Sequence, residues 1–352
     1  MKGQEKMQKK KITISVLSLF FTFIFLFVPC FNLVASATTK DISQMELYPG
    51  GMPFGVKISS PGLTIVKFTA TSGQNASSAY LAGMREGDII THINGVRVNT
   101  IEDFIKEIDK AGANQISIVA VRNNKELNFS VKPKYSKDDG RYKTGIWVKD
   151  STTGIGTVTF INPENNAFAG LGHAICDSST GKIIPVSRGT VMDVSINGVI
   201  KGKSGAAGEL KGAFLSKRIG TLTKNCATGV YGILSSNLAS TENKMKICPA
   251  SEVKEGEAYI LSTLDSGKAE KYKIKIYDID KTNSCIKSFK VKVIDQNLIK
   301  KSGGIVQGMS GSPIIQNGRL VGAVTHVLIN DPTQGYGIFI ENMINEMPQI
   351  LK

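Results

Sequence analysis

A serine enclosed by glycines near the end of the chain has the setting of a catalytic nucleophile. Ser310 lies between Met309 and Gly311, and Pro313 and an apolar strand follow it. Gly308 allows the backbone to turn so that its own amide and that of Ser310 face one point, where they would stabilise an oxyanion. The alternative is a glycine-rich turn without chemistry, but the order of loop, proline and strand favours the nucleophile.

A serine nucleophile needs a general base, and the chain has three histidines. His173 follows an apolar strand in the glycine-lined segment Gly170-Leu171-Gly172-His173. His92 is expected on the surface of a hairpin, and His326 lies on the strand that follows the nucleophile turn. His173 is therefore the predicted base for Ser310.

The elements that must position these two residues are predicted to be short strands. Apolar runs separated by turn residues cover 145–148, 156–161, 167–170, 189–196, 218–222, 229–234, 257–262, 270–279 and 288–294. They predict an all-β barrel or sandwich, and two barrels are expected because one barrel rarely needs about 200 residues. The setting of Ser310 resembles that of chymotrypsin-like proteases, in which the base also precedes the serine. By that resemblance Thr325 and His326 would line the primary specificity pocket, with a plain core histidine as the alternative for His326.

A smaller module is predicted to precede these strands, over residues 38–133. It has a tight hairpin at Asn94-Gly95 and a helix that begins after Thr100. The order of these elements resembles a PDZ domain of the bacterial, protease-associated type, and such domains bind a carboxyl-terminal peptide as an added strand. The loop expected to hold the peptide carboxylate consists of Met52, Pro53, Phe54, Gly55 and Val56, with an ordinary turn as the alternative. Residues 134–144 are polar and predict a linker, and residues 145–352 are the expected peptidase domain.

The N-terminal segment, residues 1–37, is predicted to enter a membrane. Five lysines within residues 1–11 precede an uncharged apolar stretch from Ile12 to Ala37. The length of the stretch favours an uncleaved anchor, whereas Ala35-Ser36-Ala37 has the form of a signal-peptide cleavage site. The lysines would stay in the cytoplasm, so everything after about residue 37 is expected to cross the membrane.

Composition excludes several other functions. The net charge is +14, but it is scattered and no nucleic-acid recognition motif accompanies it, so no nucleic acid is expected as a partner. Three histidines and five cysteines without a C-x-x-C pair do not predict a metal site. No complete nucleotide-binding motif is present, so no cofactor is expected.

The pattern as a whole resembles the SpoIVB peptidase family of spore-forming Firmicutes. The resemblance rests on the membrane-entering N-terminus, the PDZ-like module, the Gly-Leu-Gly-His-Ala sequence around His173 and the Gln-Gly-Met-Ser-Gly-Ser-Pro sequence around Ser310. The family's catalytic residues fall on His173, Asp295 and Ser310, so Asp295 would orient the base and stabilise its imidazolium. Asp177 and Asp193 are the alternatives for the acid, and an aspartate without a catalytic role is a further alternative for Asp295.

The resemblance also implies a biological role. Members of the family are serine endopeptidases of sporulation, exported across the forespore inner membrane to the intermembrane space. They cleave themselves, with the PDZ domain acting in self-recognition. They also cleave a membrane-bound inhibitory partner of an intramembrane metalloprotease, so that the precursor of the late mother-cell sigma factor is processed. The alternatives are a non-catalytic PDZ scaffold that binds membrane partners and an envelope quality-control protease of the HtrA type.

Overall fold

The computed structural model describes residues 42–70, 76–178, 180–236, 243–265, 267–282 and 286–351. The predicted signal sequence or anchor of residues 1–37 lies outside these ranges. Within the described ranges, no helix has the length and apolar character needed to cross a membrane. Asp41–Lys352 form one compact unit.

Two rings of six antiparallel strands carry the peptidase part. The first ring runs through β2 (Pro53–Phe68), β9 (Ile146–Ile161), β10 (Ala167–Gly170), β13 (Gly229–Leu234), β12 (Glu209–Cys226) and β11 (Arg188–Ile200), which pairs back with β2. The second is a closed barrel of β15 (Gly256–Ser262), β16 (Glu270–Tyr277), β17 (Phe289–Val293), β20 (Asp331–Phe339), β19 (Arg319–Leu328) and β18 (Pro313–Gln316). The expected mainly β chain with two barrels is confirmed.

Each ring closes around its own apolar core. Phe54 and Phe168 meet edge to face in the first ring, with ring centroids 5.6 Å apart. In the second barrel, Phe289 packs on Phe339 at 5.2 Å. All four residues of β10 are buried, because this strand lies between β9 and β13. The chain continues from β10 directly into the loop of His173.

A PDZ-like module follows the first half of β2. It contains the end of β2, α2 (Ser78–Leu81), β3 (Ile89–Ile93), β4 (Val96–Arg97), α3 (Ile101–Ala111), β5 (Ile116–Arg122) and β6 (Lys125–Val131). Asn94 and Gly95 have φ of 50° and 79°, the left-handed values of a two-residue hairpin turn. Thr100 and Asp103 form a reciprocal capping box at the start of α3. The predicted hairpin and helix of this module are confirmed.

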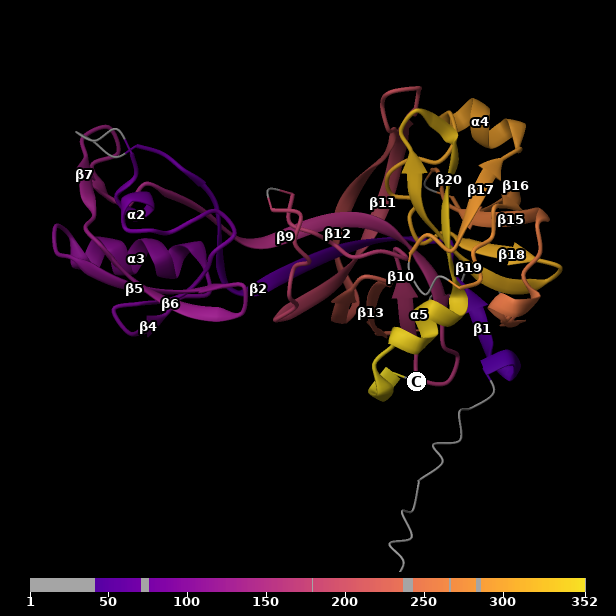
Figure 1. Cartoon of the computed structure of the whole chain (residues 1–352), viewed down its shortest axis with the longest axis horizontal. Coiled ribbons are helices and arrows are strands. Elements are labelled where there is room, and N and C mark those ends of the chain that lie inside the picture. The colour runs from indigo at the N-terminus through magenta and orange to yellow at the C-terminus, as the bar shows by residue number, and fades with distance from the viewer. Residues whose placement is uncertain are drawn as a thin grey trace, which may run out of the picture. The chain divides into compact units, whose positions relative to one another are not determined.

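Strands β2 and β9 are shared by the two modules. They pair from Pro53 opposite Thr157 to Phe68 opposite Ile146, and they lie side by side in Figure 1. The first half of β2 pairs with β11 on its other edge. The first ring therefore begins at Pro53, about ninety residues before the expected start of the peptidase domain at 145.

The predicted peptide-binding loop at Met52, Pro53, Phe54, Gly55 and Val56 is wrong for this reason. Phe54 and Val56 are buried in the core of the first ring. The backbone of this segment pairs with β9 and β11, so its amides are not free to hold a carboxylate. The sequence could not show this, because the partner strands are far away along the chain.

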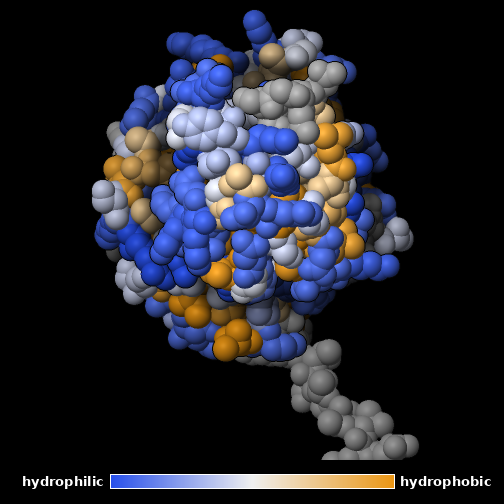
Figure 2. Space-filling view, turned by 90° about the vertical axis from the view of Figure 1, so that its left-hand side faces the viewer, coloured by the Kyte–Doolittle hydropathy of each residue, from blue (hydrophilic) through white to orange (hydrophobic). Residues whose placement is uncertain are grey.

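Shorter elements complete the structure. They are β1 (Glu46–Pro49), β14 (Met245–Lys246), β7 (Lys134–Ser136), β8 (Arg141–Lys143), α4 (Gln296–Ser302), α5 (Ile340–Glu346), and the 3-10 helices η1 (Ile42–Gln44), η2 (Ala250–Glu252) and η3 (Gln349–Leu351). The predicted linker contains the β7–β8 hairpin. Hydrophilic residues cover most of the face in Figure 2, and the hydrophobic areas between them are small.

Candidate active site

The predicted nucleophile and base line one cavity. His173 and Ser310 both border a space of about 560 Å³. Its walls come from the middle of β9 (residues 154–156), the loop after β10, residues 305–308 and the second half of β19 (residues 325–327). The two rings of strands therefore bring together residues that are far apart in the sequence, as the predicted chemistry requires.

The loop before Ser310 has the form of an oxyanion hole. The Gln307 carbonyl accepts a hydrogen bond from the Leu210 amide at 2.8 Å, and the Met309 carbonyl accepts one from the Ser312 amide at 2.9 Å. Carbonyl and amide of one peptide plane point in opposite directions. The amides of Gly308 and Ser310 are therefore turned away from these partners, and neither donates to any residue in the described part of the chain.

The Ser310 hydroxyl rests on a backbone carbonyl. It donates to the Thr325 carbonyl at 2.8 Å, and no hydrogen bond joins it to His173 within the described ranges. The hydroxyl must leave this carbonyl and turn to the base before its proton can be transferred. A rotation about χ1 of Ser310 is sufficient to move the oxygen between staggered positions.

A backbone carbonyl fixes the ring of His173. The Nδ1 atom lies 2.9 Å from the Ala174 carbonyl oxygen. A carbonyl only accepts, so Nδ1 carries the proton and Nε2 has the free lone pair that a general base needs. Burial lowers the pKa of His173, and the hydrogen bond to Ala174 opposes this effect.

The lowered pKa predicts the pH dependence of the nucleophile. The base acts in its neutral form, so reaction of Ser310 with a fluorophosphonate should keep its rate below pH 6.5, the ordinary pKa of histidine. The rate should fall only when the pH drops through the lowered pKa. The measurement is the labelling rate between about pH 4 and 8. An acid limb centred at or above the ordinary value would contradict the prediction.

Asp295 lies at the start of a helix rather than at the base. Its Oδ1 accepts from the Asn297 and Leu298 amides at 3.0 and 3.1 Å, which caps α4, and its Oδ2 accepts from the Lys273 amide at 3.1 Å. Asp295 is not among the residues that line the cavity, and no hydrogen bond joins it to His173 in the described part of the chain. The structure brings His173 and Ser310 together but not Asp295.

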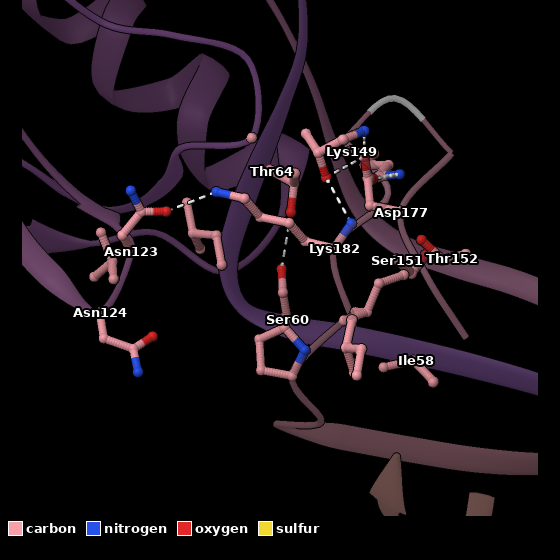
Figure 3. A pocket seen from close by; sticks show the side chains of 17 residues that line it. Ile58, Ser60, Thr64, Asn123, Asn124, Lys149, Ser151, Thr152, Asp177 and Lys182 are labelled. Carbon is pink, nitrogen blue, oxygen red and sulfur yellow. Dashed lines mark hydrogen bonds and ion pairs between the residues drawn. The ribbon is translucent and has the colours of Figure 1, made fainter. Parts of the chain in front are cut away.

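The two alternative acids are placed elsewhere as well. Asp177 borders a separate cavity of about 200 Å³, where it pairs with Lys149 and accepts from the Thr180 amide at 2.9 Å (Figure 3). In the same view Lys182 donates to Asn123 at 2.7 Å. Asp193 borders a third cavity, away from His173.

The capping geometry predicts how substitutions of Asp295 behave. Asp295→Asn keeps a capping side chain, so the rate of fluorophosphonate labelling should stay within about threefold of the wild-type rate. Asp295→Ala should lower the free energy of unfolding by about 1 kcal/mol. The labelling rate checks the prediction for Asp295→Asn, and thermal unfolding checks the prediction for Asp295→Ala. A triad acid would give a different result, a fall of about 10⁴ in the asparagine variant.

Thr325 and His326 both border the cavity, as the pocket prediction requires. The Thr325 hydroxyl is buried and donates to the Ile286 carbonyl at 3.0 Å, so this side chain is not available to a substrate. The His326 ring lies 5.0 Å from that of His173. Burial is the main cause that lowers the pKa of His326 to about 4, and the charges of His173 and Lys287 add to it. His326 is therefore neutral at pH 7.

The PDZ-like module has a groove that the sequence analysis missed. Ile101, Phe104, Ile105 and Ile108 of α3 face the segment 141–148 across a space of about 290 Å³. The Thr144 carbonyl accepts from the Ala79 amide and the Gly145 carbonyl from the Thr69 amide. The amides of Gly145 and Ile146 point in the opposite directions. The signal is Gly145 before the apolar run at 146–148, which the sequence assigns to the first strand of the peptidase domain.

No group of three or more histidine, cysteine or acidic side chains in the described ranges is arranged to hold a metal ion. The site is thus built from a serine, a neutral histidine and backbone amides. The two β rings with this site between them define a serine peptidase. The family model SpoIVB peptidase S55 matches residues 140–344, and the chain belongs to that family. A PDZ domain model matches residues 69–122.

Curated relatives match only in part. The regulator of sigma-W protease RasP of Bacillus subtilis is 31% identical over 64 residues, which are 18% of this chain and 15% of that protein. The putative zinc metalloprotease LL2128 of Lactococcus lactis is 29% identical over 115 residues, which are 31% of this chain and 26% of that protein. The chain thus spans about a quarter or less of the length of these relatives.

Two solved structures are also similar. The active form of the Rv3671c protease from M. tuberculosis has 13% sequence identity and a TM-score of 0.33, with 55% of this chain and 73% of that chain covered. The PDZ domain of the SdrC-like protein from Listeria monocytogenes has 19% identity and a TM-score of 0.23, with 26% and 93% covered.

Proposed function

We propose that this serine peptidase is an intercompartmental signalling protease of sporulation. It cleaves itself and a membrane-bound inhibitory partner of an intramembrane metalloprotease, which then processes the precursor of the late mother-cell sigma factor. Membership of the S55 family supports this role, and the PDZ domain supports action on other proteins. The lysine-flanked apolar segment supports export across the forespore inner membrane to the intermembrane space, with the protein anchored or released there.

The observation that carries the proposed chemistry is the shared cavity of His173 and Ser310, beside which the amides of Gly308 and Ser310 donate to no residue of the described ranges. His173 Nε2 takes the Ser310 proton as Oγ attacks a peptide carbonyl carbon. The amides of Gly308 and Ser310 hold the oxyanion. His173 then protonates the departing amine, and water hydrolyses the acyl-enzyme by the same route in reverse.

The experiment for the chemistry uses a fluorophosphonate probe on the fragment 42–352. The wild-type fragment should be labelled and Ser310→Ala should not be, while Ser312→Ala, at the next serine along the chain, should keep the label. A folded wild-type fragment without label would favour the scaffold alternative.

The experiment for the sporulation role uses Ser310→Ala in sporulating cells. The sigma-factor precursor should remain unprocessed in an immunoblot, and the membrane-bound inhibitor should remain intact. Normal processing with an inactive Ser310 would contradict the signalling role, even if the purified fragment reacts with the probe.

The PDZ groove predicts an apolar peptide with a free carboxylate as ligand. The carboxylate would accept from the amides of Gly145 and Ile146, and apolar side chains would pack on α3. Trp147 lines the groove and is the chain's one tryptophan, so its fluorescence should change on peptide addition. The same peptide with a carboxyl-terminal amide is the control. Equal responses to both peptides would exclude carboxylate recognition.

A further inference from the structure

Strand β9 holds the nucleophile loop through two threonine side chains. The Thr157 hydroxyl donates to the Gly308 carbonyl at 2.8 Å, and the Thr159 hydroxyl donates to the Gly311 carbonyl at 2.8 Å. The Thr157 amide also donates to the Ser310 carbonyl at 3.0 Å. Thr157 thus contacts the loop at two points, on either side of Met309.

We propose that the Thr157 hydroxyl is the group that positions the oxyanion hole. The amides of Gly308 and Ser310 are separated by the peptide plane between Gly308 and Met309. The Thr157 hydroxyl binds the carbonyl of that plane. Rotation of this plane would change the angle between the two amides, and an oxyanion needs both to point at one position.

The loop needs such a restraint because of its glycine. Gly308 has a φ of +96°, a conformation that glycine leaves easily because it has no Cβ. The neighbouring planes are held by the Leu210 and Ser312 amides, and Met309 donates to the Val306 carbonyl at 3.1 Å. In the plane between Gly308 and Met309 these bonds hold only the amide, and the Thr157 hydroxyl donates to the carbonyl that they leave without a donor.

Thr157 also contacts the loop of the base. Its carbonyl accepts from the Leu171 amide at 3.2 Å, two residues before His173. Thr157 is 1% exposed, so none of these three hydrogen bonds competes with bulk water. One buried residue thus sets the position of both halves of the site, although it touches no substrate. We expect it to act as a positioning residue.

The test compares variants of Thr157 in the fragment 42–352. Thr157→Val removes the hydroxyl at nearly constant volume, and Thr157→Ser keeps it. Thr153→Val is the matched control, because Thr153 is an exposed threonine of the same strand. The labelling rate with a fluorophosphonate should fall about 10- to 100-fold in Thr157→Val, up to the loss seen when an oxyanion donor is removed. Thr157→Ser should stay within about threefold of wild type, and Thr153→Val should be unchanged.

Two further readouts separate positioning from stability. The acid limb of the pH profile should not move in Thr157→Val, because the base is intact. Thr159→Val removes the hydroxyl bound outside the plane between the two amides, so it should lower the thermal midpoint with a smaller loss of rate. If Thr157→Val does not fold, the pair Thr157→Ser and Thr157→Ala decides, since these differ by the hydroxyl alone.

The outcomes are distinct from those of the proposed chemistry, on which this inference rests. An unlabelled wild-type fragment would refute the chemistry itself. Labelled wild type with an equal rate in Thr157→Val would overturn only the positioning role. The positioning role would also be overturned if the loss of labelling rate were proportional to the loss of thermal midpoint, with the same ratio in Thr157→Val and Thr159→Val. The loss of rate would then follow from stability alone.

Discussion

Replacing His173 by alanine should remove most of the reactivity of Ser310. Without a base the serine stays protonated, and loss of the base in a serine peptidase costs up to about 10⁶ in rate. The oxyanion amides remain, so a residual reaction well above the uncatalysed rate is expected. The measurement is the second-order rate constant for fluorophosphonate labelling of the fragment 42–352.

His92→Ala is the matched control for this prediction. His92 lies in the hairpin of β3 and β4, in the PDZ-like module, and does not border the cavity. Its replacement should leave the labelling rate unchanged. A His173→Ala variant that labels as fast as His92→Ala would mean that another group activates Ser310.

Replacing Gly311 by alanine should have the second large effect, on the shape of the nucleophile loop. A Cβ at this position would lie 2.1 Å from the Thr157 carbonyl oxygen and 2.4 Å from the Leu171 amide nitrogen, and both are backbone atoms. The φ of Gly311 is +94°, which adds strain for any other residue. We expect a loss of several kcal/mol in the free energy of unfolding, and no labelling of Ser310.

Gly318→Ala separates the clash from the backbone conformation. Gly318 has a φ of +74°, but beyond its own chain neighbours no heavy atom of the described residues lies within 4 Å of the position its Cβ would take. Its substitution should cost only about 1 kcal/mol, and labelling should continue. Chemical denaturation of both variants checks the comparison. Equal losses at both glycines would mean that strain, and not the approach of Thr157, determines the effect.

Local patterns predicted the parts of this molecule that depend on neighbouring residues. The hairpin at Asn94-Gly95 and the cap of α3 follow from short-range turn and helix signals, and both are confirmed. The loops of His173 and Ser310 were visible because glycines and apolar strands flank them. The structure then adds that one cavity contains both residues.

Long-range pairing explains what the sequence did not show. Residues 52–56 were assigned to the PDZ module because the strands that pair with them come more than ninety positions later. Asp295 entered through a family resemblance, and its neighbours show a capping role that no spacing could reveal. Thr157 carries no signal at all, since a threonine in a strand is ordinary.

The shared strands have a consequence for the construction of the chain. Phe68 and Ile146 are cross-strand partners at one end of the β2–β9 pair, so the PDZ domain is inserted between two strands that could be joined by a tight turn. Along the chain, the PDZ domain therefore occupies the position of the loop in the β2–β9 hairpin. The free-energy cost of closing a loop rises slowly with its length, by about 0.6 kcal/mol for each doubling. Such an insertion can be exchanged, enlarged or lost while the register of the barrel stays the same, whereas a deletion that begins before Pro53 would remove a strand of the barrel itself.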